Sequence, residues 1–200
     1  MKNYFIYFNQ ILITIYSHIW MKFYNLEVIS ENFIINKGKK YILVANHFSK
    51  KDPFIITPFL PWNARFVIIP YRFLVTKDYM KGVLMRIFLY LCGCFFNMAG
   101  KETLKTAQGF LNRGETIFIF PEGKMNKTGK FDKSIKLGVG AVYLERNNPD
   151  LYLIPVKIEY LGKRKIKLTY KKPFRHKKFP KDLYPLMEKT MKGIYKSKSP

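Results

Sequence analysis

The sequence predicts an α/β fold, in which a mixed but largely parallel sheet is flanked by helices. Short apolar runs of strand length alternate with segments of helical periodicity, as in β-α-β units. The length of 200 residues suits one domain with a continuous core. We therefore expect a single domain over residues 1–200, with an N-terminal helix in 1–25, a core in 41–160 and a basic strand and tail in 161–200.

The first element is an amphipathic helix predicted over Tyr4–Trp20, a stretch without a formally charged side chain. Its polar face carries Gln10, Thr14, Ser17 and His18. Its apolar face carries Phe5, Phe8, Leu12, Ile15 and Ile19. The stretch is shorter than the roughly 20 residues of a perpendicular membrane span. We expect it to lie in a membrane interface, with covering of the domain core as the alternative.

Apolar runs bounded by turn residues predict the strands of the sheet. They are Tyr41–Ala45, Arg65–Ile69, Cys94–Met98, Thr116–Phe120, Tyr152–Tyr160 and Lys165–Lys171. The last strand alternates strictly, which predicts one core face and one basic surface face. Ile166, Leu168 and Tyr170 form the first face, and Lys165, Lys167, Thr169 and Lys171 form the second.

Between these strands, helices are predicted over Tyr79–Leu91, Glu102–Arg113 and Ser134–Arg146. Gly93 and Gly114 are expected to cap the first two at their C-terminal ends. Arg86 argues against a membrane span within Val83–Ala99, because a charge in hydrocarbon is costly. Asp52 and Pro53 are typical of a helix N-cap and first helical position, and the final residues 196–200 are typical of a frayed tail.

The chain is strongly basic, with 36 Lys and Arg against 13 Asp and Glu and a formal net charge of +23. Such an excess predicts an anionic partner, either an anionic membrane surface or nucleic acid. A basic nucleic-acid-binding module is the alternative from another class, but no RNA-recognition signature, zinc spacing or basic recognition helix is present, so no nucleic acid is expected. Cys92 and Cys94 are too few for a disulfide framework and have no histidine at ligand spacing, so no metal is expected.

The segment "VANHFSKKDPF", residues 44–54, contains the first candidate for chemistry. His47 and Asp52 are five residues apart and can meet only across a turn, which Asn46 and Ser49 favour. If they meet, Asp52 orients the imidazole, and the other ring nitrogen takes a proton from a substrate hydroxyl. Without a protein nucleophile, that hydroxyl would itself attack. The alternative is that Asp52 is only a helix cap and His47 only a polar loop residue.

The segment "FPEG", residues 120–123, follows a buried strand and forms the second candidate. In an open α/β sheet, ligands bind at the carboxyl ends of strands. Cations follow at Lys124, Lys127 and Lys130. A carboxylate among lysines can form a polar pocket for an anionic headgroup or phosphate, although an ordinary strand and turn is the alternative.

Four blocks in this order resemble the glycerolipid acyltransferases typified by lysophosphatidic acid acyltransferase. The family's NHx4D block is matched at Asn46, His47 and Asp52. Its FPEG block is matched at Phe120, Pro121, Glu122 and Gly123. "KLG" with Lys136 and Gly138 resembles its KxG block, and "LIPV" with Pro155 resembles its terminal proline block.

The resemblance implies a glycerolipid acyltransferase fold with an amphipathic membrane anchor, placed peripherally or monotopically on the cytoplasmic face of a membrane. His47 would be the base and Asp52 would orient it. Glu122 and Gly123, with Lys124 and Asn126, would bind the acceptor. The implied reaction moves an acyl chain from acyl-CoA or an acyl-carrier-protein thioester to a lysophospholipid such as lysophosphatidic acid, in phospholipid biosynthesis, and no bound cofactor is implied.

Two of the sequence blocks depart from the family pattern. Met98 and Ala99 stand where the block after the second apolar region usually ends in an arginine, and Met125 stands where an arginine often follows FPEG. "FPEGKMN" also resembles the tafazzin branch, whose members exchange acyl chains between phospholipids without a thioester. A tafazzin-like transacylase is therefore the alternative within the same chemistry.

Overall fold

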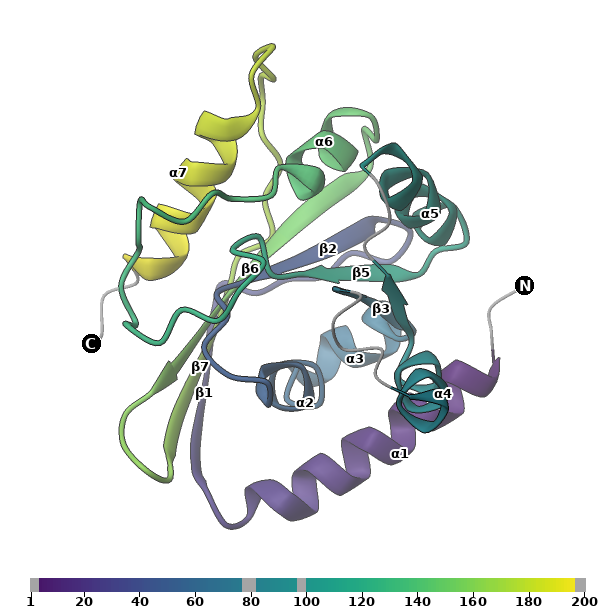
Figure 1. The fold of residues 1–200 in the computed structure, drawn as a ribbon, viewed down its shortest axis with the longest axis vertical. Helices are drawn as coiled ribbons and strands as arrows, with labels where there is room; N and C mark the ends of the chain where they lie inside the picture. Colours follow the sequence, from purple (N-terminus) through teal and green to yellow (C-terminus); the bar gives the residue numbers. More distant parts are fainter. Residues whose placement is uncertain (1–3, 77–81, 97–99, 197–200) are drawn as a thin grey trace.

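One sheet runs through the molecule and organises it (Figure 1). The computed structural model describes residues 4–76, 82–96 and 100–196. Its strands are β1 (Asn25–Glu31), β2 (Lys40–Ala45), β3 (Tyr71–Val75), β4 (Cys94–Phe96), β5 (Thr116–Ile119), β6 (Leu151–Tyr160) and β7 (Lys165–Lys171). Its helices are α1 (Tyr4–Met21), α2 (Asp52–Ile56), α3 (Trp62–Ile68), α4 (Val83–Leu91), α5 (Lys101–Asn112), α6 (Gly140–Arg146) and α7 (Tyr184–Tyr195).

The seven strands lie in the order β1-β7-β6-β2-β5-β3-β4. Within the described sheet, β6 and β7 pair antiparallel and every other neighbouring pair is parallel. The predicted fold class, a mixed and largely parallel sheet with flanking helices, is therefore confirmed. β2 lies between β6 and β5 and runs parallel to both, so the carboxyl ends of these three strands share one edge of the sheet.

Helices cover both faces of the sheet (Figure 1). The core cluster on one face includes residues of α1, α2 and α3 together with Leu43 and Ala45 of β2. The cluster on the other face includes residues of α5, α6 and α7 together with Ile42 and Val44. Since successive strand residues point to opposite faces, β2 is buried on both sides, which explains its uninterrupted apolar run.

Several predicted elements are confirmed within a few residues. They are the strands at β2, β5, β6 and β7 and the helix at α5. Gly93 (φ +84°) and Gly114 (φ +74°) follow α4 and α5 in the left-handed conformation expected after a helix. The predicted strand Cys94–Met98 begins as β4, but residues 97–99, which include the departures Met98 and Ala99, lie outside the described residues. Residues 79–81 of the predicted helix and 197–200 of the predicted tail lie outside them too.

The strand predicted over Arg65–Ile69 was wrong, because these residues belong mainly to α3. Ala64 and Ile68 are both fully buried, and their spacing of four puts them on one helix face. A short apolar run does not distinguish a strand from a buried helical turn. The strand of this region is β3, which begins after Pro70.

Other boundaries needed correction. α6 begins at Gly140 and not at Ser134, because residues 134–139 form a loop. Lys51 is the N-cap of α2, and Asp52, the predicted cap, is its first helical residue. Lys167 and Thr169 were predicted to lie on a basic surface face, but both are buried. They are buried because β1 pairs with β7, and Lys167 contacts Glu27 there. β1 and α7 were not predicted.

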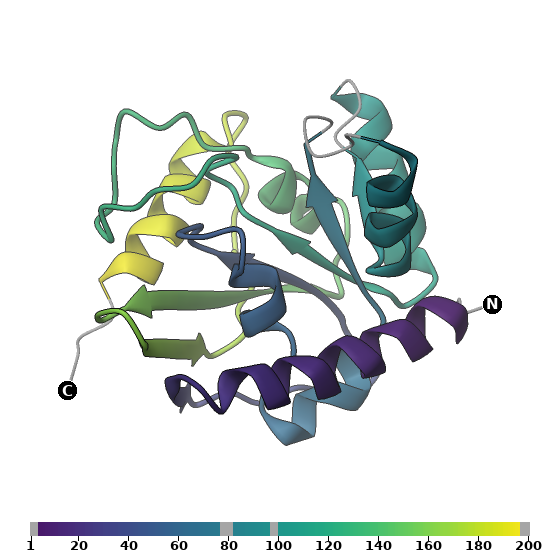
Figure 2. The same cartoon turned by 60° about the horizontal axis from the view of Figure 1, so that its bottom comes forward.

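α1 turns its polar face toward the domain and its apolar face outward. The side chain of Gln10 is fully buried, accepts the Tyr71 N–H (3.1 Å) and donates to the carbonyl oxygens of Tyr71 (2.6 Å) and Cys92 (3.2 Å). The exposed apolar side chains of α1 are Tyr4, Phe5, Phe8, Leu12, Ile15, Tyr16 and Ile19. α4 contacts α1 and exposes Val83, Leu84, Met85, Ile87, Phe88 and Tyr90. We call these two sets together the apolar surface; Figure 2 shows α1 lying across the lower side of the molecule.

Candidate active site

The loop after β2 brings His47 and Asp52 together. His47 Nδ1 lies 3.0 Å from Asp52 Oδ2, so the turn closes the five-residue gap. The His47 ring stacks on Phe120, with 4.1 Å between ring centroids, and the side chain remains 13% exposed. Because a carboxylate accepts hydrogen bonds, Nδ1 carries the hydrogen and Nε2 keeps its lone pair. Nε2 forms no hydrogen bond with the part of the chain that the structure describes.

Asp52 is fully buried, and four donors converge on it. Besides the His47 ring, Oδ2 accepts the backbone N–H groups of Phe48 (2.6 Å) and Ser49 (2.7 Å). Oδ1 accepts the hydroxyl of Tyr160 at 2.8 Å. These bonds fix the carboxylate in one orientation, and through it the His47 ring. Asp52 therefore organises the loop instead of capping α2.

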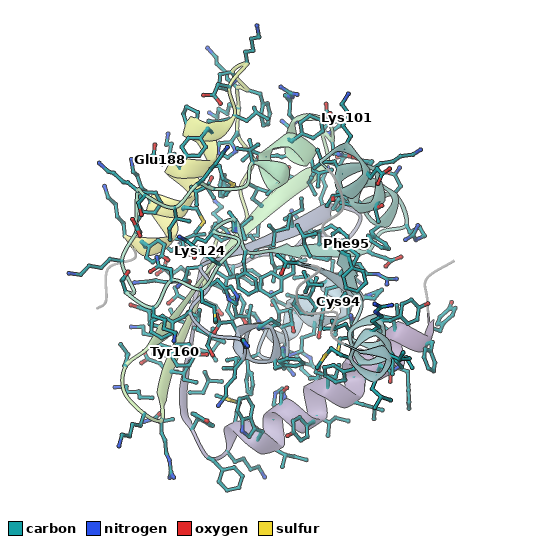
Figure 3. The ribbon with its side chains drawn as sticks, viewed as in Figure 1. Cys94, Phe95, Lys101, Lys124, Tyr160 and Glu188 are labelled. Atoms are coloured by element: carbon teal, nitrogen blue, oxygen red, sulfur yellow. The ribbon has the colours of Figure 1, made fainter. Side chains whose placement is uncertain are left out.

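Tyr160, at the carboxyl end of β6, belongs to this cluster and was missed by sequence reasoning. Burial raises the pKa of its phenol, and the negative charge of Asp52 raises it further. The Tyr160 ring stacks on Phe48 with 4.8 Å between centroids. Its position at a strand's carboxyl end is a signal that could have found it. In Figure 3, Tyr160 and Lys124 lie on the same side of the molecule, away from Cys94 and Phe95.

Glu122 ties the second loop to the first. It is 4% exposed, and Oε2 accepts the backbone N–H of His47 at 2.8 Å. Oε1 accepts the Asn126 side-chain amide (3.0 Å) and the Tyr195 hydroxyl (2.6 Å). Asn126 N–H donates in turn to the His47 carbonyl oxygen at 2.6 Å. The two loops predicted to carry the chemistry therefore form one hydrogen-bonded unit.

Tyr195, in the last turn of α7, closes this unit from the other face of the sheet. Burial raises the pKa of its phenol, and the hydrogen bond to Glu122 acts in the same direction. Asn126 also donates to the Tyr195 oxygen at 3.1 Å. Nothing in the sequence pointed to Tyr195, because its contact depends on the packing of a helix that was not predicted.

The remaining motif residues position these loops. Asn46 exchanges two hydrogen bonds with the backbone of Ile158 on β6, at 2.9 and 2.8 Å. Gly138 N–H donates to the Pro121 carbonyl oxygen at 2.7 Å, which anchors the FPEG loop. Pro155 pairs with Val44 of β2 and lies where the β6–β7 ladder stops.

The predicted acceptor-binding residues divide into buried and exposed sets. Glu122 and Asn126 are buried and their polar atoms already have protein partners. Gly123 (φ +63°) and Lys124 are exposed on the loop, as is Lys136. Their part in binding an acceptor stays a prediction. Among the described residues, no group of three or more His, Cys, Asp and Glu side chains could hold a metal ion.

An apolar groove lies beside the His47 loop. Its volume is about 460 Å³, and α1, α2 and α4 form it together with Lys51. The lining residues are Leu12, Ile13, Tyr16, Trp20, Lys51, Phe54 and Phe88. Lys51 and Phe54 flank Asp52 and Pro53 in the sequence, and Leu12, Tyr16 and Phe88 of the apolar surface line the same groove. Within the described residues, no helix combines the length and apolar character needed to cross a membrane.

The pair can act as a general base toward a bound hydroxyl. Asp52 stabilises positive charge on the ring, and Nε2 is the nitrogen available for proton transfer. The N–H groups near the start of α2 are already used, since Asp52 N–H donates to Ser49 O and Phe54 N–H to Lys51 O. An oxyanion would therefore need other donors than these.

Comparisons with known proteins found a family match and a solved structure of similar fold. The family model named Acyltransferase matches residues 21–159, which include His47, Asp52 and the FPEG loop. A search of curated proteins found no match. A solved structure, the 1-acyl-sn-glycerophosphate (LPA) acyltransferase PlsC from Thermotoga maritima, is similar in fold, with a TM-score of 0.66 and 22% identity over 93% of this chain and 76% of that one. This chain belongs to the acyltransferase family.

Proposed function

We propose that the protein is a membrane-associated glycerolipid acyltransferase. It moves a fatty acyl chain from a CoA or acyl-carrier-protein thioester to the free hydroxyl of a lysophospholipid such as lysophosphatidic acid. The observation that carries this proposal is the His47–Asp52 pair, 3.0 Å apart, with Nε2 unpaired among the described residues and an apolar groove beside it. Family membership supplies the reaction class, and the groove favours a lipid substrate.

In this mechanism, His47 Nε2 removes the proton from the acceptor hydroxyl as its oxygen attacks the thioester carbonyl carbon. The carbon–oxygen bond forms, the tetrahedral intermediate collapses and the carbon–sulfur bond breaks. The imidazolium then gives its proton to the leaving thiolate, so that the base is regenerated. Asp52 holds the ring throughout, and its charge stabilises the imidazolium.

The apolar surface supports peripheral placement on a membrane. Soluble monomers rarely expose large contiguous apolar patches, whereas α1 and α4 expose thirteen apolar side chains on adjacent helices. Gln10 holds α1 in this orientation by bonding the β3 backbone. The helix would lie in the interface, and the lysine-rich surface would add attraction to anionic lipid of about 1 kcal/mol per lysine near the headgroups. Because CoA thioesters are cytoplasmic metabolites, we place it on the cytoplasmic face.

Purified protein should be incubated with labelled acyl-CoA, acyl-carrier-protein thioester or phospholipid as donor, each against a panel of lysophospholipids. We expect transfer from a thioester. The lysophospholipid that gains the label identifies the acceptor specificity. Transfer from phospholipid alone would move the protein to the tafazzin-like branch. If no donor supports transfer while the protein binds DNA with steep salt dependence, the enzyme proposal fails in favour of nucleic-acid binding.

A further inference from the structure

A basic groove lies between α7 and the segment that follows β7, and the proposed reaction does not use it. Its volume is about 830 Å³, and Glu31 is the only carboxylate that lines it in the described part of the chain. Its cationic side chains are Lys171, Lys172, Arg175, Lys177, Lys178 and Lys189. We call this feature the basic groove. His176 lines it as well, and its ring is paired with the buried Glu145 at 2.7 Å.

The positive charge of the basic groove is not neutralised from within. Among the described residues, none of its six cations lies within ion-pair distance of a carboxylate. The Nε of Arg175 is buried and has no hydrogen-bond partner within residues 4–76, 82–96 and 100–196. Burial lowers the pKa of Lys171, with Lys157 acting in the same direction and Glu31 and Glu159 opposing it. A surface of this kind attracts an anionic ligand electrostatically.

The basic groove continues along the outer side of α7. A second hollow of about 480 Å³ shares Lys189 and Gly193 with it and adds Lys192 and Lys196, with Glu188 ion-paired to Lys192. An elongated basic surface suits a macromolecule better than a single small anion. Phe174 and His176 line the groove, but both rings are partly buried and pack edge to face on each other, with 5.0 Å between their centroids. This packing disfavours the base stacking on which single-stranded nucleic acid binding depends.

The position of α7 also argues against a membrane as the occupant. α7 packs on one face of the sheet, and α1 packs on the other (Figure 1). Figure 3 shows Glu188, on α7, on the side of the molecule away from α1. When the apolar surface contacts a membrane, the basic groove faces the aqueous phase. Its partner is therefore soluble and anionic, which by charge complementarity indicates a protein with an acidic surface.

α7 links the basic groove to the candidate active site. Lys189 of the groove lies on the same helix as Tyr195, whose hydroxyl donates to Glu122 at 2.6 Å. We propose that the basic groove is a docking site for an acidic carrier protein that presents the acyl thioester to the His47 loop. This inference rests on the proposed function, since it assigns the donor of that reaction to a protein-borne thioester.

The test uses the full-length protein in detergent with two donors that carry the same acyl chain. In the groove variant, Lys177→Glu and Lys178→Glu are combined; in the control, Lys37→Glu and Lys105→Glu, both exposed outside the groove, change the net charge equally. We expect the groove variant to lose kcat/KM for the acyl-carrier-protein thioester on the order of tenfold, mainly through KM. Its kcat/KM for acyl-CoA should match that of the control.

Two outcomes overturn the proposal: an equal loss with both donors, or full activity with the carrier-borne thioester. A binding measurement separates this inference from the enzyme proposal, because it does not depend on turnover. Fluorescently labelled holo acyl-carrier protein is titrated with the protein, and its anisotropy is followed at increasing salt concentration. We expect salt-sensitive binding by the wild type and by His47→Ala, and weakened binding by the groove variant. Absence of binding at low salt, or equally strong binding of duplex DNA to the groove, would also reject it.

Discussion

Two substitutions of Asp52 can separate its role in folding from its role in chemistry. In Asp52→Ala, the N–H groups of Phe48 and Ser49 and the hydroxyl of Tyr160 lose their acceptor. A buried donor without a partner costs about 1–3 kcal/mol, so the expected loss of unfolding free energy is roughly 3–9 kcal/mol. Because a domain of this kind is stable by only about 5–15 kcal/mol, Asp52→Ala should be barely folded or unfolded.

Asp52→Asn should behave differently, because its amide oxygen can occupy the Oδ2 position and accept the N–H groups of Phe48 and Ser49 and the Nδ1–H of His47. The amide nitrogen then faces the Tyr160 hydroxyl, which can accept. Only the charge is lost, which weakens each of the three bonds by about 1 kcal/mol and lowers the free energy of unfolding by about 3 kcal/mol.

Chemical denaturation in detergent, followed by circular dichroism, measures both losses, and transfer assays measure activity. The Asp52→Asn variant should fold and yet lose most of its turnover. Losses below about 1 kcal/mol in both variants would refute the idea that Asp52 organises the loop.

Three further predictions concern α1 and the thiols. Gln10→Leu should lower the free energy of unfolding by about 2–5 kcal/mol, because it leaves polar backbone groups of Tyr71 and Cys92 unpaired; a loss as small as that of a surface substitution would contradict this. Ile15→Ser should leave the stability unchanged and weaken sedimentation with anionic vesicles by about tenfold or more; unchanged vesicle binding would disprove the role of the apolar surface. Burial raises the pKa of Cys92 to about 12 from 9.0, so this thiol stabilises the fold below pH 9 and loses that contribution as the pH rises toward 12. Iodoacetamide at pH 8 should therefore label Cys92 only after unfolding, and rapid labelling of the folded protein would contradict the burial.

Sequence patterns predicted the elements that are buried on both faces or along one clear stripe. β2, β5 and β6 are buried on both faces, and α5 has a clear apolar stripe and a glycine at its end, so their local signals agree with the fold. The run at Arg65–Ile69 failed because its β-branched residues favour a strand, whereas the preceding Pro61 and the packing of Ala64 and Ile68 favour a helix.

Long-range pairing explains the other failures. β1 is a mostly exposed edge strand without strong alternation, and only its ladder with β7 makes it a strand. The same ladder buries Lys167, which the alternating pattern had placed on the surface. For the candidate site, the turn signals predicted that His47 and Asp52 meet. They could not predict that Tyr160 and Tyr195, far along the chain, would bond to Asp52 and Glu122.

His47 is the proposed base, and the chain offers a matched control. His176 pairs with the buried Glu145 at 2.7 Å, much as His47 pairs with Asp52, but it lies beside α7 and away from the apolar groove. The measurement is the initial rate of transfer from acyl-CoA to a lysophospholipid by the wild type, His47→Ala and His176→Ala, each checked for folding by circular dichroism. We predict that His47→Ala loses nearly all turnover and that His176→Ala keeps it. Turnover retained by folded His47→Ala, or lost equally in both variants, would contradict it.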